Sequence, residues 1–508
     1  MNNEKNSTLM CELSGKSFFS EISKDISLPD YQPEIKRLIK ITANILPPKM
    51  DFGMDDTVFS GSIDYYVLYL GSDDQMYCAP VSDEYSVNMP LDTREMAESY
   101  SCFADITCEA INGRVTAPRN LTVRVKLKIN ARIFSNLSLN DTFSDGACDE
   151  SIKKLCGTVN SCRAERRVSE PVRVTDEIIL DMREGDVRVI CADGRVMLSE
   201  VKGNNDEMYL RGDAYIKILA CRENAGTPYV IQRKLPIFAS IPISGADASA
   251  SLYAKGSVSE LSVIVEDGRI SLEVGVVFDC MSLKNAPVSY VKDMYSTVCS
   301  TRCDYKKYKV VSESDGIFCN ITSSETLSLD EVSVDPASVI SDISAISRID
   351  SVENDGSRMK ASGTVRYNLA LENSGEYSSK EIELPFTYTC ERHEDWEKVF
   401  PSSEVISTRG RMDGERISLE CEIALTFKAY CETEISALEA MHFGEAISED
   451  KCTVVVFPSV DDSIWSIAKK YNAPTERIIS SNSVLSKMSD KLSLDDADAL
   501  SGVHHIII

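Results

Sequence analysis

Apolar and polar residues alternate strictly over three long stretches of the chain. In residues 121–133 every odd position is apolar and every even position is polar, and the same period of two covers 270–280 and 417–427. Such a period is typical of an antiparallel strand with one face in the core. Because a slip of one residue would expose the whole apolar set, we expect each strand to have a fixed register.

The alternating strands belong to a sequence repeat. A glycine followed by alternating apolar residues occurs at Gly61, Gly212 and Gly363, and each glycine follows the previous one by 151 residues. Equal spacing of this kind indicates three copies of one structural unit. We interpret the glycines as bulge or turn positions rather than as ligand contacts.

Two further landmarks recur in the same order around each glycine. An acidic-aliphatic segment lies 32 to 34 residues upstream, and a turn dipeptide lies 51 to 56 residues downstream, at the start of the long strand. The dipeptides tolerate positive φ and predict a hairpin entering that strand. The segments are marked by Leu28, Leu180 and Leu329, and the dipeptides are Asn112-Gly113, Asp267-Gly268 and Asp413-Gly414.

These patterns predict a mainly β fold, with three tandem antiparallel β-rich, sandwich-like repeats followed by a small α/β module. A short helix is expected at 33–39, with Pro33 in its first turn, and 436–450 reads as a short helix or a linker. The predicted divisions are an N-terminal tail 1–16, repeat 1 at 17–136, a linker 137–152, repeat 2 at 153–292, repeat 3 at 293–436, a linker 437–451 and the last module at 452–508.

The pattern of apolar and polar residues changes after Cys452. A short strand at 453–457 precedes a segment in which Ile464, Ile467, Ala468 and Tyr471 fall on one face of a helix, with Asp462 or Ser463 as its N-cap. A second short helix is expected from Pro474 or Thr475 to Asn482. The closing strand is either 491–494 or 503–508.

Charge and cysteine content narrow the function classes. The 508 residues carry a net charge of −26, which disfavours binding to nucleic acid or an anionic membrane surface. The N-terminus shows no apolar core of signal-peptide length and no apolar run approaches the ~18 residues of a membrane span, so we expect a chain that stays in the compartment that made it. The 17 cysteines include no Cys-x-x-Cys pair, and residues such as Cys280 and Cys421 fall at apolar strand positions, which favours reduced, mostly buried thiols.

Signatures of catalysis are missing from the sequence. We find no nucleophile elbow, Walker loop or dinucleotide-binding glycine triplet. The four histidines (His393, His442, His504 and His505) lack a second ligand at metal-binding spacing. The repeats share turn and core positions without shared catalytic residue types, so we expect no enzymatic activity, no metal and no cofactor.

The C-terminal segment resembles a LysM domain. Asp462-Ser-Ile-Trp-Ser-Ile-Ala-Lys-Lys-Tyr471 is similar to the LysM signature, and Asn482 matches the asparagine after its second helix. The resemblance implies a shallow groove for N-acetylglucosamine-containing glycans formed by Asp461, Asp462, Ser463, Ile464, Ile479, Ser480, Ser481, Asn482 and Ser483, over a structural core of Trp465, Ile467, Ala468 and Tyr471. Asp461 replaces the usual glycine and places a charge where the backbone should approach the sugar, so the module is interpreted first as a protein-docking module.

The whole arrangement resembles the SipL-type spore-envelope morphogenesis proteins of clostridia. Three β repeats precede one LysM-like module, and the first repeat opens with Leu28-Pro29-Asp30-Tyr31-x-Pro33-Glu34-Ile35. In that family the repeats are called SPOCS domains. The resemblance implies a sporulation protein of the mother-cell cytoplasm at the forespore surface, which partners the coat morphogenetic ATPase, stage IV sporulation protein A.

Three hypotheses follow for function. The first is a non-enzymatic adaptor or scaffold in spore coat assembly, whose LysM-like module docks that ATPase and whose repeats serve as scaffold or homo-oligomerisation surface. The second is a peptidoglycan-binding protein acting through the sugar groove. The third is an enzyme hidden in a β repeat, against which stands the lack of a carboxylate pair common to the copies.

Overall fold

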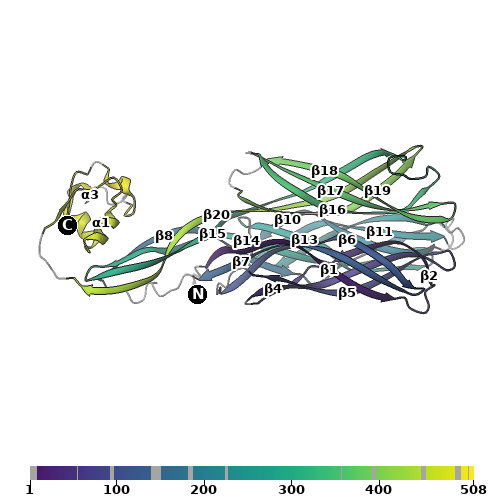
Figure 1. The fold of residues 1–508 in the computed structure, drawn as a ribbon, viewed down its shortest axis with the longest axis horizontal. Coiled ribbons are helices and arrows are strands. Elements are labelled where there is room, and N and C mark those ends of the chain that lie inside the picture. Colours follow the sequence, from purple (N-terminus) through teal and green to yellow (C-terminus); the bar gives the residue numbers. More distant parts are fainter. Residues whose placement is uncertain are drawn as a thin grey trace.

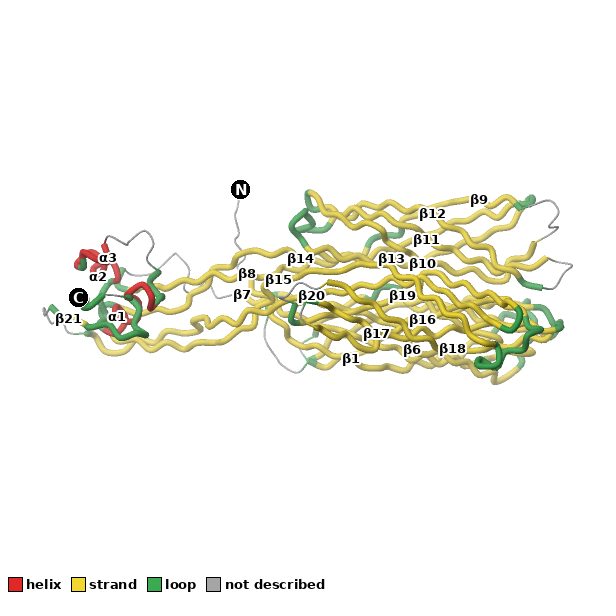
Figure 2. Tube along the Cα trace, turned by 90° about the horizontal axis from the view of Figure 1, so that it is seen from above, coloured by secondary structure: helices red, strands yellow, loops and turns green. Residues whose placement is uncertain are grey.

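The computed structural model shows an elongated molecule with a thick β-rich body at one end, a narrow stalk and a small helical module at the far end of the stalk (Figures 1 and 2). The structure describes residues 8–53, 55–91, 97–138, 150–180, 187–222, 227–355, 357–391, 396–447, 453–486, 493–501 and 503–508. The predicted mainly β fold with antiparallel sheets is confirmed.

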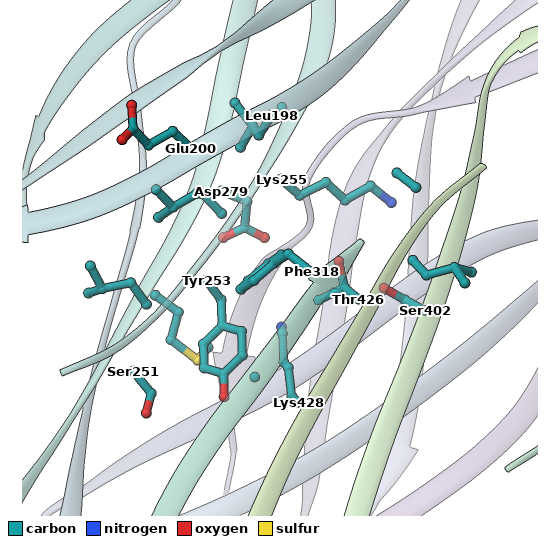
Figure 3. A pocket seen from close by; sticks show the side chains of 18 of the residues that line it. Leu198, Glu200, Ser251, Tyr253, Lys255, Asp279, Phe318, Ser402, Thr426 and Lys428 are labelled. Carbon is teal, nitrogen blue, oxygen red and sulfur yellow. The ribbon is translucent and has the colours of Figure 1, made fainter. Parts of the chain in front are cut away.

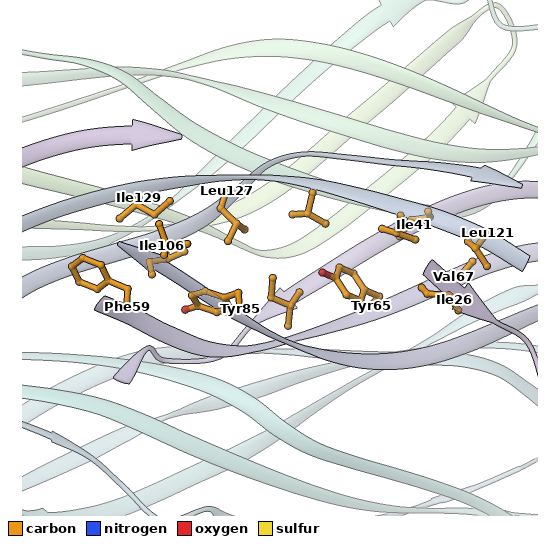
Figure 4. Packing of buried hydrophobic residues seen from close by; sticks show 14 of the residues in the cluster. Ile26, Ile41, Phe59, Tyr65, Val67, Tyr85, Ile106, Leu121, Leu127 and Ile129 are labelled. Carbon is orange, nitrogen blue, oxygen red and sulfur yellow. The ribbon is translucent and has the colours of Figure 1, made fainter. Parts of the chain in front are cut away.

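The first repeat forms a two-layered sandwich. One layer has the strand order β1-β7-β6, and the other is built around β4, which pairs with β2 and β3 on one side and β5 on the other. The long alternating strand is β7, whose odd positions from Leu121 to Ile133 are buried between the layers (Figure 4). The strands are β1 (Thr8–Ser27), β2 (Ile35–Ile45), β3 (Lys49–Phe52), β4 (Asp56–Gly71), β5 (Met76–Pro90), β6 (Ser99–Ala117) and β7 (Asn120–Ser138).

The second and third repeats build the same sandwich. The layer β10-β11-β12 faces a layer in which β14 pairs with β13, β8 and β9, and the layer β16-β17-β18 faces β19-β20-β15. The strands of repeat 2 are β8 (Ile152–Val168), β9 (Val172–Ile179), β10 (Val187–Asn204), β11 (Glu207–Arg222), β12 (Tyr229–Pro242), β13 (Ser251–Glu266) and β14 (Arg269–Ser296). Those of repeat 3 are β15 (Cys299–Ser328), β16 (Val339–Asp355), β17 (Arg358–Asn373), β18 (Glu376–Glu391), β19 (Lys398–Asp413) and β20 (Arg416–Ala446).

The leucine landmark has the same role in each repeat. Leu28, Leu180 and Leu329 are all buried. Their backbone N–H groups donate to the turn before the long strand, at the carbonyl oxygens of Arg119 (2.8 Å), Gly268 (2.9 Å) and Glu415 (2.9 Å). The acidic-aliphatic signature therefore marks the point where β1, β9 and β15 end against the last hairpin of their sandwiches.

In repeats 2 and 3 the repeated glycine sits opposite a register shift of the neighbouring strand, as a bulge position should. A Cβ on Gly212 would lie 2.3 Å from the carbonyl oxygen of Met197, beside the register shift at Leu198. A Cβ on Gly363 would lie 2.3 Å from the carbonyl oxygen of Arg348, beside the shift at Ile349. Only glycine allows the two backbones to come this close.

The hairpin prediction is correct in two repeats and wrong in the first. Asp267, Gly268 and Gly414 have positive φ at their turns. Asn112-Gly113 instead lies inside β6, and the turn into β7 is formed by residues 118–119. A Cβ on Gly113 would lie 2.3 Å from Ile41 Cδ1 on β2, so a dipeptide with turn chemistry stands where two sheets approach closely.

The predicted helix over 33–39 is also wrong, because Ile35–Ile45 is strand β2. Register shifts after Ile35 and Leu38 break its alternation. The interrupted pattern buries Ile39 and Lys40 side by side. The apolar residues of the segment therefore have a helix-like spacing, although the segment is a strand paired with β4.

Two repeats extend beyond their sandwiches to form the stalk, which comprises residues 152–162, 285–310 and 435–446. The ribbon β8–β14 and the ribbon β15–β20 are joined at the tip by residues 297–298. They pack on each other around a cluster of buried residues that also includes Leu9 and Cys11 at its base: Val159, Val288, Tyr290, Val310, Ile435 and Ala437.

The stalk changes several predicted boundaries, because strand pairing continues past the sandwich cores. The predicted division at 292/293 falls inside β14, and the predicted linker 437–451 is strand as far as Ala446. The predicted tail 1–16 is strand from Thr8 onward, and the predicted linker 137–152 includes the end of β7 and the first residue of β8, while 139–149 lie outside the described residues.

The three sandwiches pack around a common centre. Two clusters in the body each draw buried side chains from all three repeats. In one of them Phe103, Tyr253 and Phe400 occupy equivalent positions, since each pairs across its hairpin with an equivalent residue of the last strand: Arg132, Met281 and Lys428. The repeats are therefore arranged with approximate threefold symmetry.

The described cysteines are all free thiols. Cys280 and Cys421 are buried among apolar neighbours, as their strand positions predicted. Cys78 and Cys191 meet between repeats 1 and 2, with 2.9 Å between their sulfur atoms. Within the described part of the chain, no helix is both long enough and apolar enough to cross a bilayer.

Candidate functional site at the end of the stalk

The C-terminal module is a two-stranded antiparallel sheet covered by short helices. The chain order is β21 (Val455–Val456), α1 (Ile464–Lys470), α2 (Thr475–Ser481), α3 (Ser483–Ser486), the 3-10 helix η4 (Ala497–Leu500) and β22 (Ile506–Ile507), and β21 pairs with β22. Of the two segments considered for the closing strand, 503–508 supplies it.

Helix α1 begins where the sequence indicated. Ser463 accepts a hydrogen bond from the backbone N–H of Ser466, and the Ser463 N–H donates to the Ser466 hydroxyl, which completes a capping box. Ile467 and Ala468 are buried as predicted. Tyr471, predicted as a core residue, is instead 38% exposed. Helix α1 ends at Lys470, and Tyr471 is the C-cap residue that follows it.

Trp465 joins the module to the stalk. The side chain is buried, and its indole N–H donates a 2.8 Å hydrogen bond to the Asp293 carboxylate on β14. The ring also packs edge-on against Tyr295, with 4.9 Å between centroids. The tryptophan of the LysM-like signature therefore belongs to the core of the module and also to its interface with the stalk.

Asp293 is the centre of a half-buried polar cluster. Its carboxylate also accepts hydrogen bonds from Lys469 (2.6 Å) and Tyr305 (2.6 Å). Burial by itself would raise the pKa of Asp293, but the hydrogen bonds from Lys469, Tyr305 and Trp465 outweigh it and lower that pKa. The ionised carboxylate thus fixes α1 on the stalk.

Further contacts extend this interface along the module. The Tyr295 hydroxyl donates to the carbonyl oxygen of Ala473 (2.7 Å), and the Asn472 amide donates to that of Ser296 (2.8 Å). Two ion pairs lie at its margins, Lys153 with Glu476 (3.2 Å) and Lys292 with Asp495 (2.7 Å). The module is therefore held by α1, the α1–α2 turn and the segment before η4.

Several residues of the predicted groove hold the module together. The Asn482 amide donates to the carbonyl oxygens of Ile478 (2.7 Å) and Ile507 (2.8 Å), and its oxygen accepts from the Ile507 N–H (2.9 Å). Ser463 and Ile464 are buried, and Asp462 accepts from the Ser459 N–H (2.8 Å). The signature asparagine thus ties α2 to β22.

The rest of the predicted groove is accessible. Asp461, Ser480, Ser481 and Ser483 are exposed, and Ile479 is partly buried against the module's core. Two apolar side chains flank these residues, with Val460 exposed by 93% and Val484 by 55%. None of these side chains takes part in the hydrogen bonds and ion pairs to the stalk described above. The module therefore presents an accessible surface of small polar and apolar residues.

Sequence reasoning missed the stalk side of this site. Asp293 and Tyr295 were assigned to a repeat boundary, although the alternation of Val288 and Tyr290 continues toward them. That alternation was the available signal for a longer strand. No pattern in the sequence linked Asp293 to Trp465, 172 residues further along the chain.

The described residues contain no group of three or more His, Cys, Asp or Glu side chains arranged to hold a metal ion. Comparison with known proteins found no matching family, no matching curated protein and no matching solved structure.

Proposed function

We propose that this protein is a non-enzymatic adaptor that uses its C-terminal module to dock a partner protein and its three-sandwich body as a scaffold. The observation that carries the proposal is the position of the module. It is held at the end of the stalk through Asp293, Trp465 and Lys469, while Asp461, Ser480, Ser481 and Ser483 are exposed.

The resemblance to SipL-type proteins supplies the expected partner and place. On that basis the partner is the spore coat morphogenetic ATPase, stage IV sporulation protein A, and the protein acts in the mother-cell cytoplasm at the forespore surface. The exposed Val460 and Val484 favour a protein partner, since apolar side chains at the centre of an interface contribute through burial.

The alternative is a LysM protein that binds N-acetylglucosamine-containing glycan. The feature against it is Asp461, whose side chain and charge occupy the position where a glycine would let sugar approach the backbone. The buried Asn482 and Ser463 also leave fewer free hydrogen-bonding groups for a sugar.

The test uses the full chain with changes at two exposed apolar side chains of the module, Val460→Arg with Val484→Arg. Binding to the purified ATPase should fall at least about tenfold, since buried arginines replace apolar contacts. The matched control is Ile179→Arg at the end of β9, an apolar residue whose exposure (76%) lies between those of Val460 and Val484, and which should bind as the unmodified chain does.

A parallel sedimentation with purified peptidoglycan separates the alternatives. Retention by glycan without binding to the ATPase would overturn the adaptor proposal. Stronger glycan binding by Asp461→Gly, with no ATPase binding by either chain, would identify a latent sugar site. Equal ATPase binding by the arginine variant and the unmodified chain would place the docking surface elsewhere and contradict the role given to the module.

A further inference from the structure

The boundaries between the repeats differ in their chemistry. A cavity of about 750 Å³ lies where the three repeats meet (Figure 3), and there Lys255 of repeat 2 lies 3.3 Å from Glu404 of repeat 3 and 3.6 Å from Asp105 of repeat 1. These charges neutralise one another within the protein. At the boundary between β5 of repeat 1 and β10 of repeat 2, two free thiols meet instead, with 2.9 Å between the sulfur atoms of Cys78 and Cys191.

Other thiols of the body show a contrasting situation. Cys102, Cys280 and Cys421 each belong to the core of a single sandwich, where a thiol serves as a small apolar side chain. Cys78 and Cys191 are only partly buried, and they pack against a cluster drawn from all three repeats. Their contact joins parts of the chain 113 residues apart, so a bond between them would link two sandwiches.

Neighbouring contacts hold the two strands in place. Arg188 of β10 donates a 3.1 Å hydrogen bond to the carbonyl oxygen of Met76 on β5, and its guanidinium lies 4.9 Å from the ring centroid of Tyr77. The two sulfur atoms of a disulfide are about 2.05 Å apart. Bond formation therefore requires the two thiols to approach by less than about 1 Å.

The surroundings of Cys191 select a small oxidant. Cys191 lines a cavity of about 20 Å³ together with Lys40, Lys217 and the carboxylates of Asp193 and Asp342. This volume admits about one molecule of the size of water. Hydrogen peroxide is close to that size, whereas oxidised glutathione is far larger.

The two thiols have different roles in such a reaction. The contact with Cys191 and burial raise the pKa of the Cys78 thiol well above its usual value, so Cys78 stays protonated at neutral pH. The thiolate is the form of cysteine that attacks an oxidant. Cys191 is therefore the thiol that reacts first, and Cys78 is the thiol that completes the bond.

We propose that Cys78 and Cys191 form a reversible disulfide between repeats 1 and 2 when the protein meets a peroxide. The Cys191 thiolate attacks the peroxide, so that an S–O bond forms as the O–O bond breaks and hydroxide leaves. The Cys78 sulfur then attacks the Cys191 sulfur, the S–O bond breaks, and the oxygen leaves as water with the proton of the Cys78 thiol. In sum the two thiols lose two hydrogen atoms and the peroxide becomes two molecules of water.

The disulfide would act as a clamp on the body. It closes a loop of 113 residues, and the closure of a long loop stabilises a fold mainly by restricting the unfolded chain. A dithiol reductant reverses the reaction by thiol–disulfide exchange. The proposal is independent of the partner bound by the C-terminal module.

The first experiment treats the full chain with hydrogen peroxide, blocks the remaining thiols with iodoacetamide and digests the protein without reductant. Mass spectrometry should find the peptide of Cys78 linked to that of Cys191, and dithiothreitol should remove the link. Cys191→Ser should abolish the linked peptide, whereas Cys319→Ser, at a partly buried thiol of repeat 3, should keep it. No linked peptide in the unmodified chain, or linkage of Cys78 to other cysteines as often as to Cys191, would overturn the proposal.

The second experiment measures thermal unfolding before and after peroxide. The midpoint of the unmodified chain should rise by at least about 2 °C on oxidation and fall back after dithiothreitol. Cys191→Ser and Cys78→Ala, treated alike, should show no rise, which separates the disulfide from oxidation of other side chains. A linked chain whose midpoint does not rise, or an equal rise in Cys191→Ser, contradicts the clamp.

Discussion

At two places in the centre of the body, here called levels, the three repeats bring equivalent strand positions together, and the two levels differ in how charged side chains are paired. At one level three equivalent positions, each directly after a β-bulge, carry Lys40, Cys191 and Asp342. At the other level the equivalent positions are Arg132, Met281 and Lys428. The first level neutralises its buried charges within the protein and the second leaves one cation unpaired. Equal backbone positions therefore have unequal roles, which are set by their partners.

At the first level Asp342 is the central group. Lys40 pairs with one carboxylate oxygen, and Lys217 lies 3.0 Å from the other. Burial by itself would raise the pKa of Asp342, but the charges of Lys217 and Lys40 outweigh it and lower that pKa to about 2. Asp193, 3.7 Å from Lys217, balances the second lysine.

At the second level the three equivalent positions differ in charge and in partners. Arg132 lies 3.1 Å from Glu12, and Glu12 also binds Lys398 and accepts a 2.7 Å hydrogen bond from Tyr430. Met281 is apolar and buried. Lys428 faces the rings of Phe103, Tyr253 and Phe400, and no ion pair to it occurs among the described residues. The three positions thus hold a shared ion pair, no charge, and a free charge.

Asp342→Asn should have the largest effect on stability. The change leaves Lys40 and Lys217 facing each other with only Asp193 nearby, and removing one partner of a buried charge cluster costs about 3–5 kcal/mol. The measurement is urea unfolding at pH 7. Asp213→Asn, which breaks the more exposed pair with Lys234, serves as the control and should cost less than about 1 kcal/mol. Equal losses for both variants would remove the contrast between buried and exposed pairs.

Acid should erase part of that difference. Since the pKa of Asp342 is about 2 in the folded chain and near 3.9 when unfolded, its ionisation stabilises the fold above about pH 4 and is lost as the pH falls toward 2. The gap in unfolding free energy between the unmodified chain and Asp342→Asn should therefore shrink by roughly 2–3 kcal/mol over this window. Unfolding curves of both chains at pH 7, 4 and 2 measure the gap, and a gap that stays constant contradicts the assignment.

Arg132→Met should have an intermediate effect. Glu12 keeps Lys398 as a counter-charge, so the loss is limited to one charged hydrogen-bonded contact, about 1–2 kcal/mol. Thermal unfolding of the variant beside Asp342→Asn gives the order directly. A loss as large as that of Asp342→Asn would show that Lys398 does not compensate.

Lys428→Met should have the smallest effect. No described anion loses a partner, and Met281 shows that methionine fits the equivalent place, so we expect a change below about 1 kcal/mol. The same unfolding assay applies. A loss above about 2 kcal/mol would mean that Lys428 is needed for packing of its aromatic neighbours.

Local signals in the sequence succeeded where local chemistry decides the outcome. The 151-residue spacing of Gly61, Gly212 and Gly363 identified the repeat, and the period of two identified the long strands. The predictions for Asn112-Gly113 and for the segment after Pro33 were wrong because contacts with other strands decide their structure. Gly113 makes room for Ile41, and β2 contains bulges that its pairing with β4 tolerates.

The candidate site at the stalk was only half predictable. The capping box at Ser463 and the role of Asn482 as the end of α2 follow from nearby residues. The docking of Trp465 on Asp293 joins parts of the chain 172 residues apart, and the exposure of Tyr471 depends on where the helix ends. Neither leaves a periodic trace in the sequence.

By itself the sequence determined the three β repeats, the register of their long strands and the small helical module, because burial of one strand face and helix capping are read from residues close in the chain. Only the tertiary structure decided how Lys40, Asp342, Arg132 and Lys428 are paired. Those charges meet across repeats, and whether a buried charge is neutralised, shared or left without a direct ion pair depends on which distant side chains surround it.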